Sequence, residues 1–213
     1  MFRRVVRSLP AVGAVLAVGV FSAGTVASAG GPGSDHHGSG GHHQSSRDSH
    51  GDRGHHYFRG DHRRSCRWVS AWDQQWLKMH IETNLFEIAG GQAAQNKATT
   101  DEVRDLAAQI VADHTAALEQ ATEVARRLGV EIPDAPSPLQ QWAMRAVNQF
   151  SGPDFDLWFT DLQVEGHKQA ITEAATEAER GCNSKVRALA EASLPVLQAH
   201  LEHAQAVLGG LAD

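Results

Sequence analysis

The stretch that decides the fold is residues 99–129, TTDEVRDLAAQIVADHTAALEQATEVARRLG. Thr99 with Glu102 three residues later has the pattern of a capping box, and Gly129 is the residue type that most often ends a helix. Small and apolar residues recur between them at three- and four-residue spacing, which predicts a helix with one buried face. That face consists of Val103, Ala107, Ile110, His114, Ala117, Ala121, Val124 and Leu128.

Three further segments have the same helical spacing. The first, residues 71–97, follows Ser70 and contains Asp73, and these two residues also resemble a capping box. The second covers residues 153–180 and the third residues 183–208. No alternating pattern typical of strands and no internal repeat interrupts them, so the folded part of the chain is predicted to be all-α.

The buried faces of these three helices follow from the same spacing. In 153–180 the face is Leu157, Thr160, Val164, His167, Ile171, Ala174 and Ala178; in 183–208 it is Val186, Ala190, Ser193, Leu197, His200, Ala204 and Val207. In 71–97 two faces fit, either Trp76, His80, Thr83, Glu87, Gly90 and Ala94, or Leu77, Ile81, Leu85 and Ile88. We expect the aromatic side chains to be core residues: Trp72, Trp76, Phe86, Trp142, Phe155, Trp158 and Phe159.

Four long amphipathic helices bury their apolar faces most simply in a four-helix bundle. Between the second and the third, residues 130–153 include a proline-rich stretch at 132–138 and a short predicted helix at 139–150. This connection is long enough for a crossover that makes the two helices parallel, as in ferritin-like bundles. In the last helix, Pro195 frees the carbonyl of Glu191, which predicts a kink.

The N-terminus has the features of a secretory signal peptide over residues 1–29. Arginines at positions 3, 4 and 7 precede a short apolar run, and Ala27-Ser28-Ala29 matches a small-residue cleavage pattern. The mature chain is then expected to begin at Gly30, secreted or otherwise outside the cytoplasm. The apolar run is too short for a comfortable membrane span, and the sequence predicts no transmembrane segment in the mature protein.

Residues 30–68 form a Gly-, Ser-, Asp-, Arg- and His-rich tract that has almost nothing to bury and is predicted to be disordered. Its histidines are His36, His37, His42, His43, His50, His55, His56 and His62, and such a tract either chelates metal loosely or is a solvated spacer. The tract has a net charge of +2, whereas the predicted bundle, 69–213, has a net charge of −11. An acidic bundle argues against nucleic acid or an anionic membrane as a partner.

Cys66 and Cys182 are the only cysteines of the chain. Outside the cytoplasm, two thiols form a disulfide more often than a reactive or zinc-binding pair, so a Cys66–Cys182 bond is predicted. Cys66 precedes the first long helix and Cys182 lies between the last two. These positions are at opposite ends of a simple up-down bundle but at the same end of a crossover bundle.

Several short motifs resemble the domain of unknown function 4142 family. They are Glu87-Ile88 with Gly91 and Ala94, Asp113-His114-Thr115, Phe155-Asp156, His167, Leu194-Pro195 and His200-Leu201. The resemblance covers about residues 71–209 and implies an exported bacterial protein with a ferritin-like four-helix bundle. It does not imply an established activity, and Gly166-His167 stands where a His-Glu-His-like segment would be expected.

Glu87, His114, His167 and His200 are predicted to meet at one level inside the bundle, because the rise per residue puts them at similar heights. Three imidazoles and a carboxylate suit a divalent transition metal such as Zn, Mn or Fe. Alternatively, Glu87 accepts hydrogen bonds from the histidines and no metal binds. Asp113 and Glu165 flank these positions and are candidates to orient the histidines.

Three functions remain open at this point. One is an extracytoplasmic metal binder or sensor, and the second is a structural or envelope-stress protein whose buried histidines are only hydrogen-bonded. The third, a ferritin-like redox enzyme, is disfavoured because a di-iron site needs Glu-x-x-His on two helices and the chain has none. No catalytic residue is predicted, and a non-enzymatic role is favoured.

Overall fold

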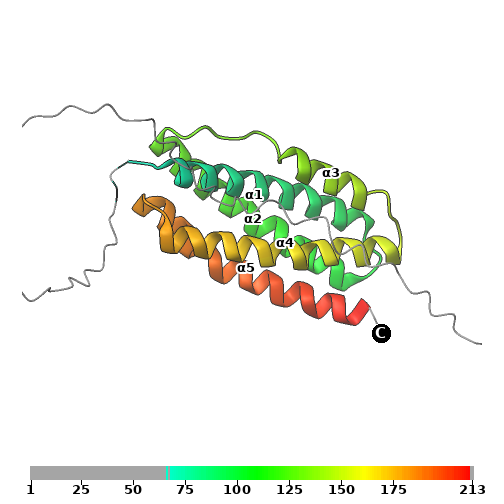
Figure 1. Ribbon diagram of the computed structural model, residues 1–213. Helices are drawn as coiled ribbons and strands as arrows, with labels where there is room; N and C mark the ends of the chain where they lie inside the picture. Colours follow the sequence, from blue (N-terminus) through cyan, green and yellow to red (C-terminus); the bar gives the residue numbers. More distant parts are fainter. Residues whose placement is uncertain (1–65, 67, 212–213) are drawn as a thin grey trace, which may run out of the picture. The chain divides into compact units, whose positions relative to one another are not determined.

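The computed structural model describes residue 66 and residues 68–211. Its helices are α1 Ala71–Lys97, α2 Asp101–Leu128, α3 Pro138–Val147, α4 Pro153–Arg180 and α5 Ser184–Leu211 (Figure 1). Their ends differ from the expected ones by no more than three residues, so the helical reading of the sequence is confirmed. The predicted signal peptide and the tract histidines lie outside the described residues.

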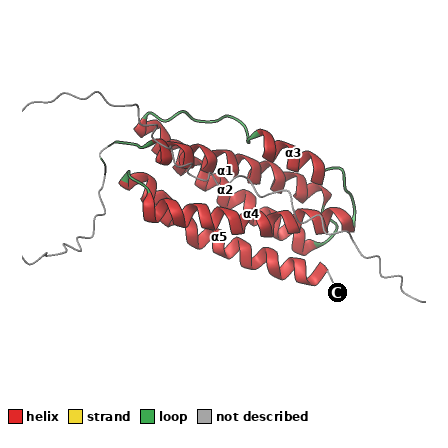
Figure 2. Ribbon diagram, in the orientation of Figure 1, coloured by secondary structure: helices red, strands yellow, loops and turns green. Residues whose placement is uncertain are grey.

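The long helices form two antiparallel pairs, α1 with α2 and α4 with α5 (Figure 1). After α2, the chain returns along the outside of the bundle through a loop and α3 before α4 begins (Figure 2). This connection is the predicted crossover, and it makes α2 and α4 parallel. The fold is therefore a ferritin-like four-helix bundle.

A buried aspartate fixes one end of the bundle. Asp156, in the first turn of α4, accepts hydrogen bonds from the backbone N–H groups of Thr99 (3.0 Å) and Thr100 (3.1 Å). The starts of α2 and α4 are thereby held together. The predicted capping box of Thr99 with Glu102 is wrong by one residue. The Thr99 hydroxyl donates a hydrogen bond to Asp156, and the side chain of Thr100 caps α2 instead.

A second buried aspartate fixes the other end. Asp73 forms the predicted capping box with Ser70 and also accepts from the backbone N–H groups of Cys182 (2.7 Å) and Asn183 (3.1 Å). The predicted disulfide joins Cys66 to Cys182, with their Cα atoms 5.1 Å apart. The start of α1 and the turn between α4 and α5 therefore lie at the same end, as the crossover topology requires.

The core consists of two apolar clusters with a polar layer between them. One cluster lies toward the Asp156 end and contains Ile110, Phe155, Phe159 and Leu201; the other lies toward the disulfide and contains Trp76, Leu77, Ile81 and Val186. Along each long helix, buried polar residues separate the two clusters: Asn84, Glu87, His114, Gln163, His167 and His200. A polar layer in the middle of a core needs internal hydrogen bonds or a ligand, since unpaired buried polar groups are costly.

The buried face of α1 combines both expected faces. Its buried residues are Asp73, Trp76, Leu77, Ile81, Asn84, Phe86, Glu87, Gly91 and Ala94. Gly91 rather than Gly90 faces α2, where a Cβ would lie 2.7 Å from Val111 Cγ2. The other predicted faces are confirmed, since all their members are buried or half-buried.

Two of the expected core aromatics are on the surface. Trp72 is 53% exposed and Trp142 is 52% exposed, so their assignment to the core is wrong. Trp72 precedes the first buried turn of α1, and Trp142 lies on the outer side of α3, which covers the bundle with one face only. Within residues 68–211, no helix has the length and apolar character needed to span a membrane.

Candidate metal centre

His114 is buried on α2 and is oriented by an amide from α1. Its Nδ1 lies 2.8 Å from Asn84 Oδ1, and Asn84 Nδ2 donates to the carbonyl of His80 (2.7 Å). Because the Asn84 amide donates through its nitrogen, its oxygen faces the ring, and His114 Nδ1 must carry the proton. His114 Nε2 is therefore a bare acceptor, and it is buried with no partner among the described residues.

His167 is buried on α4 and is held by its own helix. Its Nδ1 lies 2.9 Å from the backbone carbonyl oxygen of Gln163. A carbonyl oxygen can only accept, so Nδ1 donates and Nε2 carries the lone pair in the neutral ring. The orientation and the tautomer of this imidazole are thus fixed by the peptide backbone.

His200 is fully buried on α5 and is oriented from α2. Its Nε2 lies 2.9 Å from Asp113 Oδ2, and Asp113 itself is half-buried. The carboxylate accepts the Nε2 proton, which leaves the lone pair of the neutral ring on Nδ1. Asp113 therefore has the flanking role that the sequence predicts for it, and it brings a negative charge next to the ring.

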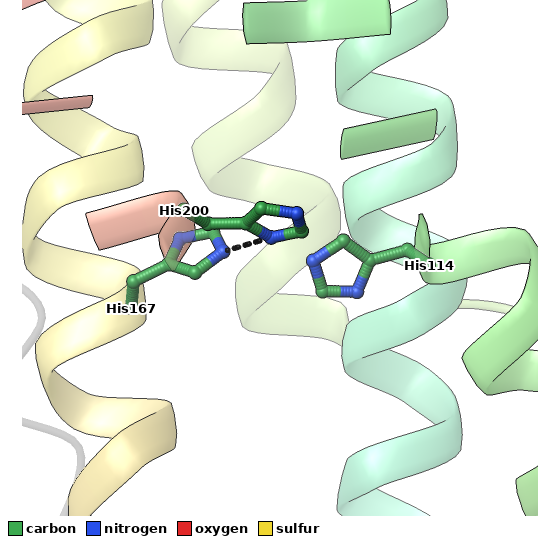
Figure 3. A group of neighbouring side chains, drawn as sticks. All are labelled: His114, His167 and His200. Atoms are coloured by element: carbon green, nitrogen blue, oxygen red, sulfur yellow. Dashed lines mark hydrogen bonds between the residues drawn. The ribbon is translucent and has the colours of Figure 1, made fainter. Parts of the chain in front are cut away.

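The three rings meet in the middle of the bundle (Figure 3). One ligand nitrogen of each ring lies within 4.8 Å of the others, and His167 Nε2 is 3.2 Å from His200 Nδ1. In Figure 3 the ring of His114 turns a nitrogen toward the other two. Three lone pairs therefore face one another, and such an arrangement is stable only if a cation, a proton or a metal ion, lies among them.

Burial makes two of the three rings, His114 and His167, poor sites for a proton. It lowers the pKa of His167 to about 4, with His200 contributing in the same direction. Burial also lowers the pKa of His114 well below its usual value, and the other histidines lower it further. These two rings are therefore uncharged at neutral pH, and each has a lone pair that can bind a metal.

Glu87 is buried in the same polar layer but is not one of the three converging groups. Its Oε1 lies close to Gly166 on α4, where a Cβ would be 3.9 Å away, and its Oε2 has no hydrogen-bond partner in the described chain. Burial raises the pKa of Glu87 to about 8, and a hydrogen bond with Gln163 opposes this shift. The predicted flanking residue Glu165 is exposed and pairs with Lys168 at 2.7 Å.

A pocket of about 20 Å³ adjoins the cluster on the side toward the disulfide. Its residues come from all four long helices: Trp76, His80, Thr83, Asn84, His114, Ala170, Glu173 and Leu197. His80 stacks on Trp76 with 4.7 Å between ring centroids, and its buried Nε2 has no partner within residues 68–211. A pocket of this volume holds a water molecule.

The sequence does not identify two of these polar residues. Asn84 is missed because an asparagine near the middle of a helix carries no sign of its role, although it lies one turn before Glu87 on the same face. His80 is on one expected face of α1, but nothing in the sequence around it indicates a chemical role. His200 points inward, as its position on the buried face predicts. His203, one turn later on α5, is half-buried and bonds Gln109 Oε1 at 2.8 Å instead of joining the cluster.

A crossover four-helix bundle with three converging buried imidazoles defines a class, namely a ferritin-like helical protein with a candidate metal centre. The chain belongs to the family described as "Domain of unknown function (DUF4142)", whose pattern matches residues 65–207. The resemblance drawn from the motifs is thereby confirmed. No curated protein matches this sequence.

Among solved structures, the chain is similar to the "Crystal structure of DUF305 fragment from Deinococcus radiodurans". The TM-score is 0.57 at 14% identity, over 67% of this chain and 98% of that chain. At this identity the likeness shows the fold alone.

Proposed function

We propose that this protein binds one divalent transition-metal ion outside the cytoplasm, through His114, His167 and His200 in the middle of the bundle. The observation that carries the proposal is the convergence of three ring nitrogens whose partner nitrogens each face an oxygen atom. Metal-binding histidines nearly always donate their second N–H to a carboxylate, a carbonyl or water. The oxygen atoms of Asn84, Gln163 and Asp113 have this role here.

The spacing of the nitrogens also suits a metal. Two ligands bound at about 2.0–2.1 Å to a tetrahedral zinc ion lie about 3.3 Å from each other. His167 Nε2 and His200 Nδ1 are 3.2 Å apart, a separation that two unprotonated nitrogens adopt comfortably only around a shared cation. Binding would thus resolve the contact between the lone pairs of these two histidines without moving them far, with His114 as the third ligand.

The donor set restricts the metal. Neutral imidazoles suit Zn, Cu, Ni and Fe, whereas Mg, Ca and Mn favour oxygen ligands. Of the metals that the sequence suggests, Zn and Fe are therefore favoured, and Mn is disfavoured unless Glu87 also coordinates. In this proposal Glu87 lies in a neighbouring buried position, and the Asp113 carboxylate offsets part of the charge of the ion.

Two features support a place outside the cytoplasm. The predicted signal peptide directs export, and the Cys66–Cys182 disulfide is typical of oxidising compartments. The His-rich tract is proposed to be a second, looser chelator on the same chain, and it complicates any binding measurement.

The test uses the full chain with the eight tract histidines replaced by glutamine, purified without a metal-affinity step. Zn²⁺ binding is measured by calorimetry, with metal content measured after dialysis. We expect one ion per chain, and loss of binding in His114→Ala, His167→Ala and His200→Ala separately. The matched control is His203→Ala, which removes a half-buried imidazole one turn from His200, outside the cluster and beside Gln109 of α2, and should keep the stoichiometry.

The opposite result has a clear meaning. If this chain binds no transition metal at micromolar concentration and His114→Ala changes nothing, the histidines are structural and the metal proposal fails. The three histidines would then only make hydrogen bonds inside the bundle and would bind no ligand.

A further inference from the structure

The pocket beside the three histidines belongs to the centre. Each proposed ligand either lines the pocket or lies within one helical turn of a lining residue. His114 lines it directly, Ala170 follows His167 on α4, and Leu197 precedes His200 on α5. A metal held by the three rings would therefore lie next to it.

The pocket leads from the surface to the histidines. Its inner residues, Trp76, Asn84, His114 and Leu197, are buried, whereas its outer residues, His80, Thr83, Ala170 and Glu173, are half-buried. Two buried ring nitrogens without partners, His80 Nε2 and His114 Nε2, lie along this path. These nitrogens give a water molecule or another small ligand in the pocket two polar partners.

We propose that the metal keeps one exchangeable coordination position, which opens on this pocket and takes water or a small anion from solvent. This inference rests on the proposed metal site and deepens it. Three protein ligands with a fourth position left to water distinguish reactive zinc sites from structural ones, in which four protein ligands close the shell. His80 and the Thr83 hydroxyl, which already accepts a hydrogen bond from Gln140 Nε2 (3.0 Å), are placed to hold the bound molecule.

The test uses Co²⁺, whose visible spectrum reports its coordination, and azide as the small ligand, with the chain that lacks the tract histidines. We expect one Co²⁺ per chain and a saturable change of the spectrum on addition of azide. Ala170→Leu fills the pocket, so it should retain Co²⁺ and abolish the azide response. Ala175→Leu, at an exposed position on the same helix, is the control and should respond as the parent does.

A second variant covers the case in which Ala170→Leu does not fold. Glu173→Gln removes a negative charge from the mouth of the pocket and should tighten azide binding roughly twofold to fivefold. Glu165→Gln removes an exposed charge of the same helix away from the pocket and should have little effect.

The outcomes separate this inference from the one it rests on. If Co²⁺ binds but azide leaves its spectrum unchanged, the shell is closed, with Glu87 as the obvious fourth ligand, and the open position is refuted while the metal site stands. If Co²⁺ does not bind, the proposed function itself fails. An azide response that survives Ala170→Leu in a folded protein would refute the role of the pocket.

Discussion

Removal of the disulfide should destabilise the bundle strongly. Cys66 and Cys182 are 116 residues apart in sequence, so their bond closes a loop that contains α1–α4. In the loop-entropy model, a loop of this length restricts the unfolded chain by about 5 kcal/mol at 25 °C. For a folded unit of about 150 residues, this corresponds to a fall in Tm of about 10–20 °C.

The estimate is an upper value, because an unfolded chain that keeps residual structure gains less freedom when the bond is removed. In the folded state, other contacts hold the same junction. The Cys66 N–H still donates to the Cys182 carbonyl at 3.0 Å, and Asp73 still accepts from Cys182 and Asn183. These hydrogen bonds keep the native state intact when the disulfide is removed. The lost stability therefore comes mainly from the greater entropy of the unfolded chain. A value of 3–5 kcal/mol is therefore expected.

The assay is guanidinium unfolding of the double variant Cys66→Ser/Cys182→Ser, followed by helical circular dichroism. Reduction of the wild-type protein should reproduce the behaviour of the variant, and reductant should leave the variant unchanged. A difference of less than about 1 kcal/mol would refute the reasoning, because the segment before α1 would then not restrict the unfolded chain in the way that the loop model requires.

Three further predictions concern packing, pH and metal affinity. Gly91→Ala should lower the free energy of unfolding by about 1–3 kcal/mol, because its Cβ would overlap α2, whereas Gly90→Ala has open space and should raise it by about 0.5–1 kcal/mol; equal effects in chemical denaturation would contradict this. Burial and then the neighbouring Asp73 raise the pKa of Glu177 to about 8, so this group is protonated in the fold and its unfolded form ionises from about pH 4.5 upward. Its contribution is therefore fully present below pH 4.5 and is lost as pH rises to about 8, at most about 1.4 kcal/mol per pH unit, and Glu177→Gln should flatten this part of the stability profile. Parallel profiles for the two proteins would rule it out. Finally, Asp113→Asn should weaken Zn²⁺ binding about 10- to 100-fold without loss of fold, as calorimetry and circular dichroism can show together; unchanged affinity would mean that Asp113 does not support the site.

The sequence predicts the helices well because their ends are encoded locally. Ser70 with Asp73, Gly129 and Pro153 each determine a boundary through backbone chemistry that needs no distant partner. Thr99 is the exception, since its side chain is taken by Asp156, a residue 57 positions away. Local rules cannot reveal such a competitor.

The candidate site is predictable in its position but not in its chemistry. Helical periodicity alone brings His114, His167 and His200 to one level. Which nitrogen of each ring is free depends on partners in other elements, such as Asn84 for His114, and only the structure supplies these. Glu87 lies in the same layer by periodicity, yet its exact distance from the rings depends on how α1 packs, which no spacing rule contains.

The two buried aspartates also fix the positions of site residues along the bundle, because each anchors a helix at a fixed spacing from one of these residues. Asn84 follows Asp73 by eleven residues, and His167 follows Asp156 by eleven residues. Eleven residues are just over three full turns, about 16 Å, so each site residue shares a face with the aspartate that anchors its helix. One residue inserted between anchor and site would turn the site residue by about 100° and carry it out of the core, while the anchor stayed in place. The same insertion in the crossover would leave the spacing between each aspartate and its site residue unchanged. The crossover can therefore vary in length, whereas the segments 73–84 and 156–167 can hardly vary at all.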